Sequence, residues 1–253
     1  GHLSVLLASK RPDLIDTICL LNATPVWGLN LQGWSGHLPP PFLPRKIGRY
    51  LFDRIRDLDT IEKYLENAYA NRDAFDDNLM KQIRGCTEGD GGHAAFASIM
   101  WSPPATFPPL PSEDDSASFY ETLSALQCDV LLIFGSEDPW CTPAFAKRMF
   151  QCLKERNGMD ENGAFGGNIS KAPVHRYVEL SNVGHCPNHE APNSVGHIAT
   201  RWIKSGNRSK DALSLLETAE QTIEEEWGGT VAREVDEHDT SLSLLDQLIT
   251  TFV

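Results

Sequence analysis

The chain has 253 residues and 41% hydrophobic content, enough to bury a sizeable core in one domain or in one domain with an insertion. Its formal net charge of −13 argues against nucleic acid as a partner, and no apolar run approaches the length of a membrane span. The six cysteines form no C-x-x-C pair, so we expect no metal site. We also expect no cofactor, and a reducing compartment such as the cytoplasm fits these cysteines better than a disulfide framework.

The first half of the chain predicts a helix, a strand and then a long helical block. Residues 2–10 have the apolar spacing of a helix that ends before Pro12, and residues 15–21 form a short run of β-formers typical of a buried strand. From residue 26 to residue 122 a Gly-, Pro- and aromatic-rich entry is followed by several short amphipathic segments. We expect helices at residues 47–58, 60–70, 77–86 and 94–100.

The second half returns to alternating strands and helices. The expected strands lie at 129–134 and 174–180, and the expected helices at 142–156 and 192–204. A Gly- and Asn-rich stretch at 157–172 predicts a surface insertion. The alternation predicts an α/β fold with a parallel sheet and flanking helices, in which residues 1–25 and 123–205 form the core. Residues 26–122 then fit a helical cap inserted between two strands.

Residues 206–253 form an acidic C-terminal tail. They include three basic and eleven acidic residues, so most of the acidic excess of the chain lies here. Two amphipathic stretches, 211–227 and 241–249, are separated by Gly228-Gly229 and predict partly ordered acidic helices without a catalytic role. The alternative is that one of them is a docking helix for a partner.

Two candidate catalytic residues follow the two strands of the second half. Asp138 comes shortly after the first strand and His185 shortly after the second. An acid and then a histidine at strand ends is the chain order of the last two members of an α/β-hydrolase triad, in which the histidine is the general base and the acid orients it. Glu137 is the competing acid. The first member should be a serine in a G-x-S-x-G turn, and the chain contains no such turn.

Four segments of the chain resemble sequences of the pheophytinase-like α/β-hydrolase family. They are Leu20–Gly28, Phe96–Met100, Glu137–Trp140, and Gly184–Pro187 followed by Glu190. The similarity covers about residues 1–204, apart from the insertion at 157–172, and does not include the acidic tail.

The resemblance implies a Ser-His-Asp esterase with the α/β-hydrolase fold, which releases phytol from pheophytin or cleaves a related prenyl-type ester in plastids. It selects Asp138 as the acid and His185 as the base. It also places the family's nucleophilic serine just upstream of Gly1. We therefore expect the chain to be a fragment that lacks the serine, both oxyanion-hole donors and the N-terminal strands of the fold, and to be inactive by itself.

The resemblance further implies that the cap binds a small apolar ester substrate. Burying a phytyl tail or a flat macrocycle requires a broad apolar and aromatic surface. The candidate substrate-binding residues are Trp27, Trp34, Phe96, Met100 and Trp101. The alternative for each of them is ordinary packing within the cap.

Two other functions stay open on the sequence alone. Epoxide hydrolases and dehalogenases share the positions of the acid and the histidine but use a carboxylate nucleophile. A non-catalytic α/β-hydrolase-like binding protein would keep the cap and have no nucleophile. The residue at the nucleophile turn upstream of Gly1 would discriminate between these classes.

Overall fold

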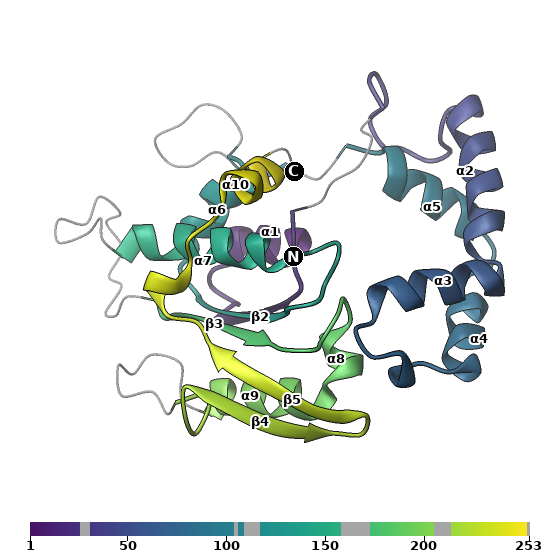
Figure 1. Cartoon of the computed structure of the whole chain (residues 1–253). Helices are drawn as coiled ribbons and strands as arrows, with labels where there is room; N and C mark the ends of the chain where they lie inside the picture. Colours follow the sequence, from purple (N-terminus) through teal and green to yellow (C-terminus); the bar gives the residue numbers. More distant parts are fainter. Residues whose placement is uncertain (26–30, 104–105, 109–116, 158–172, 205–213, 252–253) are drawn as a thin grey trace. The chain divides into compact units, whose positions relative to one another are not determined.

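The chain divides into two compact units, which are described one at a time. The computed structural model describes residues 1–25, 31–103, 106–108, 117–157, 173–204 and 214–251 (Figure 1). The core unit comprises Gly1–Pro25, Tyr69–Asn71 and Thr106–Val253, and the helical unit comprises Val26–Ala68 and Arg72–Ala105. Trp27 and all but the first residue of the expected insertion at 157–172 lie outside the described residues.

A five-stranded mixed sheet forms the centre of the core unit, with the strand order β1-β2-β3-β5-β4. The strands are β1 (Thr17–Leu21), β2 (Asp129–Gly135), β3 (His175–Leu180), β4 (Glu220–Glu225) and β5 (Gly228–Glu234). β1, β2 and β3 are parallel, whereas β5 runs antiparallel to both β3 and β4. The three parallel strands bring their carboxyl ends to one edge of the sheet, where ligands bind in open α/β folds.

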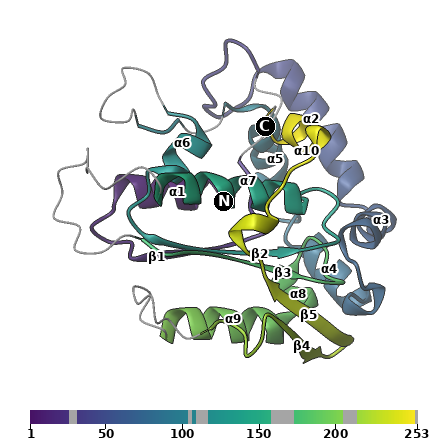
Figure 2. The same cartoon turned by 60° about the vertical axis from the view of Figure 1, so that its left-hand side comes forward.

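Helices cover both faces of this sheet (Figure 2). On one face lie α1 (His2–Lys10), α6 (Phe119–Ser124) and α7 (Pro143–Asn157). On the other face lies α9 (Pro192–Lys204), which follows the short α8 (Pro187–Glu190). The last helix, α10 (Leu244–Thr251), is held against α7 by a 3.0 Å hydrogen bond from Arg148 Nη1 to Thr250 Oγ1. The helix expected at residues 241–249 is present, with its start three residues later and its end two residues later than predicted.

The alternation of side chains along β2 builds both layers of the core. All seven residues of β2 are buried. Val130, Leu132 and Phe134 belong to the hydrophobic cluster under α1, α6 and α7, whereas Leu131 and Ile133 belong to the cluster under α9. A strand covered on both faces is apolar at every position because successive side chains point to opposite faces.

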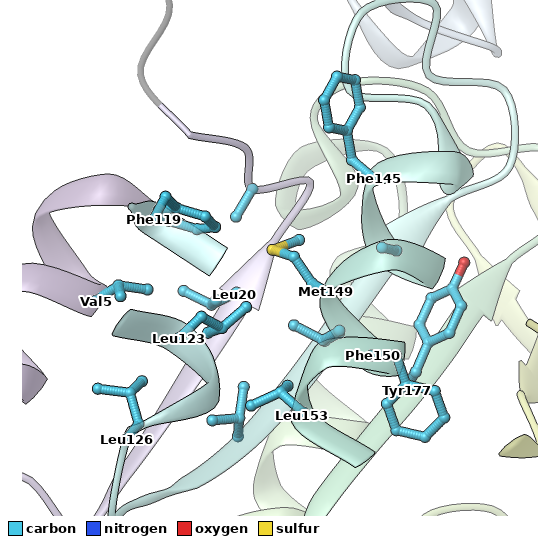
Figure 3. Packing of buried hydrophobic residues seen from close by; sticks show 14 of the residues in the cluster. Val5, Leu20, Phe119, Leu123, Leu126, Phe145, Met149, Phe150, Leu153 and Tyr177 are labelled. Carbon is cyan, nitrogen blue, oxygen red and sulfur yellow. The ribbon is translucent and has the colours of Figure 1, made fainter. Parts of the chain in front are cut away.

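Figure 3 shows how the first cluster closes around the side chains of three helices. They are Val5 of α1, Phe119 and Leu123 of α6, and Phe145, Met149, Phe150 and Leu153 of α7, which meet Leu20 of β1 and Tyr177 of β3.

The acidic tail contains a β-hairpin, so the helix expected over residues 211–227 is wrong in its described part. β4 and β5 pair with each other up to Glu225 opposite Gly228, which leaves Glu226 and Trp227 as a two-residue loop. β5 in turn adds to the free edge of β3. The tail segment is thus part of the central sheet.

The composition of β4 explains why the sequence did not reveal the hairpin. Three of its six residues are exposed, and Ile223 is its one large apolar residue, so the strand carries little of the alternation that predicts a strand. Contacts with β3 stabilise the hairpin instead. Arg176 of β3 pairs with Glu234 of β5, and Arg233 Nη2 of β5 lies 3.4 Å from Glu179 Oε1 of β3.

The core unit also extends into the segment where the sequence predicted a cap. The prediction assigned residues 26–122 to the cap, but the described residues 106–108 and 117–122 belong to the core unit. Phe107 and Phe119 are buried in the first hydrophobic cluster. The physical reason is α6, whose capping box at Ser118 starts a helix that turns its apolar face toward α1 and α7.

The helical unit contains the helices that the spacing predicted, with shifted ends. They are α2 (Phe42–Ile55), α3 (Leu58–Ala68), α4 (Asp77–Gly85) and α5 (Gly92–Trp101). α2 and α5 pack closely at Gly48, where an added Cβ atom would lie 2.8 Å from the Cβ of Ala97 and 2.9 Å from the ring of Trp101. Within the described part of the chain, no helix combines the length and apolar character needed to span a membrane.

The packing of α9 on the sheet generates a stability prediction. Trp202 is 2% exposed, and its indole Nε1 donates a 2.8 Å hydrogen bond to Thr17 Oγ1 of β1. We expect Trp202→Ala to lower the free energy of unfolding by about 3–5 kcal/mol in urea titrations, because it leaves a large cavity. The neighbouring Ile203 is 67% exposed, so Ile203→Ala should change it by less than about 0.5 kcal/mol. Equal effects of the two variants would contradict this packing.

Candidate active site

Asp138 and His185 lie in the loops that follow two adjacent parallel strands. Asp138 is three residues beyond the end of β2, and His185 is five residues beyond the end of β3. The two loops meet at Gly135, where an added Cβ atom would lie only 2.2 Å from the carbonyl oxygen of Val183. A glycine is required here because any side chain would push the histidine loop away from the acid.

The two side chains form a hydrogen bond, as the chain order predicted. His185 Nδ1 lies 2.9 Å from Asp138 Oδ2. The other carboxylate oxygen of Asp138, Oδ1, accepts hydrogen bonds from the backbone N–H groups of Trp140 (2.8 Å) and Cys141 (2.9 Å). The carboxylate is fully buried, whereas the imidazole is 32% exposed. One ring nitrogen of His185 is thus anchored in the protein, and the ring still reaches solvent.

The contact between Asp138 and His185 shifts the pKa of both residues. Burial raises the pKa of Asp138, but hydrogen bonds from His185 and from the backbone of Cys141 and Trp140 outweigh burial and lower this pKa below 3.8. Hydrogen bonds with Asp138 first, and with the Cys141 side chain second, raise the pKa of His185 from 6.5 to about 10. The acid therefore stays ionised and makes the imidazole a stronger base.

A second buried carboxylate, that of Glu190, braces the histidine loop. Its Oε1 accepts hydrogen bonds from the backbone N–H groups of Gly184 (3.0 Å) and Cys186 (3.3 Å), one residue on either side of His185. Its Oε2 accepts a 2.8 Å hydrogen bond from the backbone N–H of Ala70. The Trp140 ring packs edge-on against the imidazole, with ring centroids 4.8 Å apart. These contacts leave the histidine backbone little freedom.

Cys141 is the neighbour of the pair that sequence reasoning missed. Its Sγ lies 3.8 Å from Thr24 Oγ1, and its thiol is buried. Asp138, Cys141 and His185 each offer a possible metal ligand within 4.8 Å of one another. The Asp138 carboxylate, however, already accepts hydrogen bonds on both oxygens. We therefore interpret the three residues as an acid–histidine pair with an adjacent thiol. The signal in the sequence was the cysteine three residues after the acid.

The predicted substrate-binding residues that the structure describes belong to the helical unit. Trp101 is 8% exposed and packs against Gly48, and Phe96 contacts Phe52 with ring centroids 5.6 Å apart. Trp34 and Met100 are half-buried, and Trp34 Nε1 donates a 2.9 Å hydrogen bond to the carbonyl of His37. Trp101, Phe96 and Trp34 thus make contacts within their own unit, and the role of all four side chains toward a substrate stays a prediction.

No family model matches the chain. In sequence, the chain is 29% identical over 251 residues to "Pheophytinase, chloroplastic" of Arabidopsis thaliana, and the alignment covers 93% of this chain and 45% of that protein.

Solved structures of hydrolases resemble the chain in three dimensions. One is the 2-hydroxy-6-oxo-6-phenylhexa-2,4-dienoate hydrolase of Rhodococcus sp. strain RHA1, with a TM-score of 0.51 and 15% identity over 80% of this chain and 60% of that chain. Another is MGS-M2, an α/β hydrolase from a Medee basin deep-sea metagenome, with a TM-score of 0.50 and 11% identity over 83% of this chain and 62% of that chain.

The chain therefore has the α/β-hydrolase fold, and these three relatives are hydrolases. In sequence it is similar to the plant pheophytinase. The chain spans less than half the length of the plant relative and about three fifths of the two solved structures.

The hydrogen bond between Asp138 and His185 predicts how His185 titrates. In NMR titrations, Asp138→Asn should lower the pKa of His185 from about 10 toward 6.5, because it removes the largest cause of the shift. Glu137→Gln is the matched control, since Glu137 is the adjacent acid and is exposed. If Glu137→Gln shifts the pKa of His185 and Asp138→Asn does not, the assignment of Asp138 as the acid is wrong.

The same shifts predict the pH dependence of stability. Folding raises the pKa of His185, so its contribution is fully present below pH 6.5 and is lost as the pH rises through about 10. Folding lowers the pKa of Asp138, so its contribution is present above pH 3.8 and is lost as the pH falls through the lowered value. The difference in unfolding free energy between wild type and Asp138→Asn should therefore shrink from pH 6 to pH 10.

Proposed function

We propose that this chain is part of a carboxylic ester hydrolase that uses a Ser-His-Asp mechanism. The observation that carries the proposal is the hydrogen bond between the buried Asp138 and the partly exposed His185 at the carboxyl edge of a parallel sheet. Asp138 holds the imidazole in one orientation and stabilises its protonated form. His185 accepts the proton of the nucleophile and returns it to the departing alcohol.

We propose that the serine nucleophile lies just upstream of Gly1, in a turn that Gly1 completes. The start of α1 supports this, because Gly1 approaches so close to Thr24 that an added Cβ would lie 2.7 Å from its carbonyl oxygen. The amino group of Gly1 also lies near the Cys141 side chain. A residue preceding Gly1 would therefore enter the neighbourhood of Cys141, which itself interacts with His185. The backbone N–H that follows the serine would supply one oxyanion-hole donor, and an earlier strand–helix loop would supply the other.

The proposed substrate is the phytyl ester of pheophytin or a related prenyl-type ester, and the proposed location is the plastid. Both proposals rest on the similarity to "Pheophytinase, chloroplastic". The helical unit is the proposed cap, and its aromatic residues are the proposed wall for the apolar part of the substrate.

An extended protein tests the mechanism. The chain should be expressed as the 253 residues and also with its native upstream coding sequence, and both should be assayed with pheophytin and a p-nitrophenyl ester. We expect turnover in the extended protein alone, with kcat/KM rising with pH because the neutral imidazole accepts the proton. His185→Ala should lower kcat about 10⁶-fold and Asp138→Asn about 10⁴-fold.

His189→Ala is the control for these variants, since His189 lies four residues after His185 and stacks on Trp227 instead of contacting Asp138. Its activity should stay within a fewfold of wild type. Turnover by the 253-residue chain that survives purification and mutation of His185 would contradict the proposal. A carboxylate at the upstream turn would instead indicate an epoxide hydrolase or dehalogenase.

Substrate selection by the helical unit is tested in the same extended protein. Phe96→Ala and Met100→Ala should lower kcat/KM for a phytyl ester about tenfold relative to an acetyl ester, since only the long substrate uses the apolar wall. The ratio of the two substrates in one preparation cancels any loss of folded protein. Leu65→Ala, a buried substitution in α3 outside the proposed wall, should lower stability and leave this ratio unchanged. An unchanged ratio in all three variants would make Phe96 and Met100 packing residues.

A further inference from the structure

The Asn22 side chain links the ends of three strands at the candidate site. Asn22 follows β1 directly and is 6% exposed. Its Nδ2 donates two hydrogen bonds of 2.7 Å each, to Asp138 Oδ2 in the loop after β2 and to the carbonyl of Gly184 in the loop after β3. Its Oδ1 accepts a 2.9 Å hydrogen bond from the backbone N–H of Gly135 at the end of β2.

These contacts engage both donors and the carbonyl oxygen of the amide, and they fix which way it points. A primary amide has two N–H donors and a carbonyl acceptor, and here both donors face oxygen acceptors while the carbonyl faces an N–H group. Turning the amide over would place its oxygen against a carboxylate and a carbonyl, so the assignment of oxygen and nitrogen is unambiguous. Asn22 has φ = 40°, in the left-handed region that asparagine tolerates better than other non-glycine residues.

The two Nδ2 hydrogen bonds act on both members of the pair. Asp138 Oδ2 is the atom that also accepts from His185 Nδ1, so the Asn22 N–H limits rotation of the carboxylate about its axis. Gly184 immediately precedes His185, so the second N–H holds the histidine backbone at a fixed distance from the acid. A neutral donor does this without placing a second negative charge beside the buried carboxylate, which would be costly.

We propose that Asn22 is a positioning residue that sets the geometry of the Asp138–His185 pair. Its amide holds the acid and the histidine loop in register so that the imidazole keeps one orientation. The effect on the pair can be measured in the chain as it is, whereas the effect on turnover rests on the proposed function.

The first test is NMR titration of His185 in the 253-residue chain. Asn22→Gly removes the amide, and glycine accepts φ = 40° without strain. We expect the pKa of His185 to fall by about one unit or more toward 6.5 and its Nδ1 proton to exchange faster with water, because the contact with Asp138 is formed for less of the time. Asn182→Gly is the matched control, since Asn182 is exposed and has φ = 60°. Asn182→Gly makes the same change from asparagine to glycine at a positive φ, and it should leave the pKa and the proton exchange rate of His185 unchanged.

Asn22→Asp is the second variant and covers the case in which the glycine variant does not fold. It keeps the shape and the acceptor for Gly135 but replaces the donor by a carboxylate that repels Asp138. We expect it to release the Asp138–His185 contact, seen as faster exchange of the Nδ1 proton of His185. A His185 pKa and exchange rate equal to wild type in both folded variants would overturn the proposal.

The second test separates this proposal from the proposed function. In the extended protein, Asn22→Gly should lower kcat for the ester about 10²-fold with little change in KM, because a misplaced base affects the chemical step. If the extended wild type has no esterase activity but Asn22→Gly still lowers the pKa of His185, the proposed function fails and the positioning role stands. If the enzyme is active and Asn22→Gly changes neither the pKa nor kcat, the positioning role fails and the function stands.

Discussion

The candidate site depends on one constraint, which is that the buried carboxylate of Asp138 must be surrounded by hydrogen-bond donors. A fully buried charge is costly unless it is paired and hydrogen-bonded. Asp138 meets this condition with four donors, which are the side chains of Asn22 and His185 and the backbone N–H groups of Trp140 and Cys141. These donors come from the ends of β1, β2 and β3, so satisfying one carboxylate aligns three loops of the fold.

Buried carboxylates that accept several hydrogen bonds also join segments elsewhere in the core unit. Glu190 accepts backbone hydrogen bonds from the histidine loop and from the segment at Ala70. Glu225 of β4 accepts from the backbone N–H and hydroxyl groups of Ser194 and from the backbone N–H of Asn193, in the first turn of α9. Anions are favourable at a helix N-terminus, so this contact joins the hairpin to α9. Part of the negative charge of this acidic chain thus stabilises contacts between segments that are far apart in the sequence.

The sequence predicted the helices and strands that a local pattern identifies without knowledge of what they pack against. The run from Val130 to Phe134 is apolar at every position and forms β2 within one residue at each end. Thr142-Pro143 predicted the start of α7, which begins at Pro143. By contrast, the predicted end of the cap at residue 122 was too late, because Phe107 and Phe119 belong to the core cluster. A Pro-rich sequence gives no local sign of which unit it joins.

Chain order by itself determined that an acid and a histidine follow strands that end at one edge of a sheet, because strand ends and turn residues are local features. The tertiary structure decided which groups complete the pair. Asn22 lies 116 residues from Asp138 and 162 residues from Gly184, and Cys141 meets Thr24 across 117 residues. The acidic hairpin likewise became part of the sheet through the pairing of β5 with β3. Such contacts depend on which strands become neighbours when the sheet forms. A local pattern of charge or hydrophobicity does not determine which strands pair.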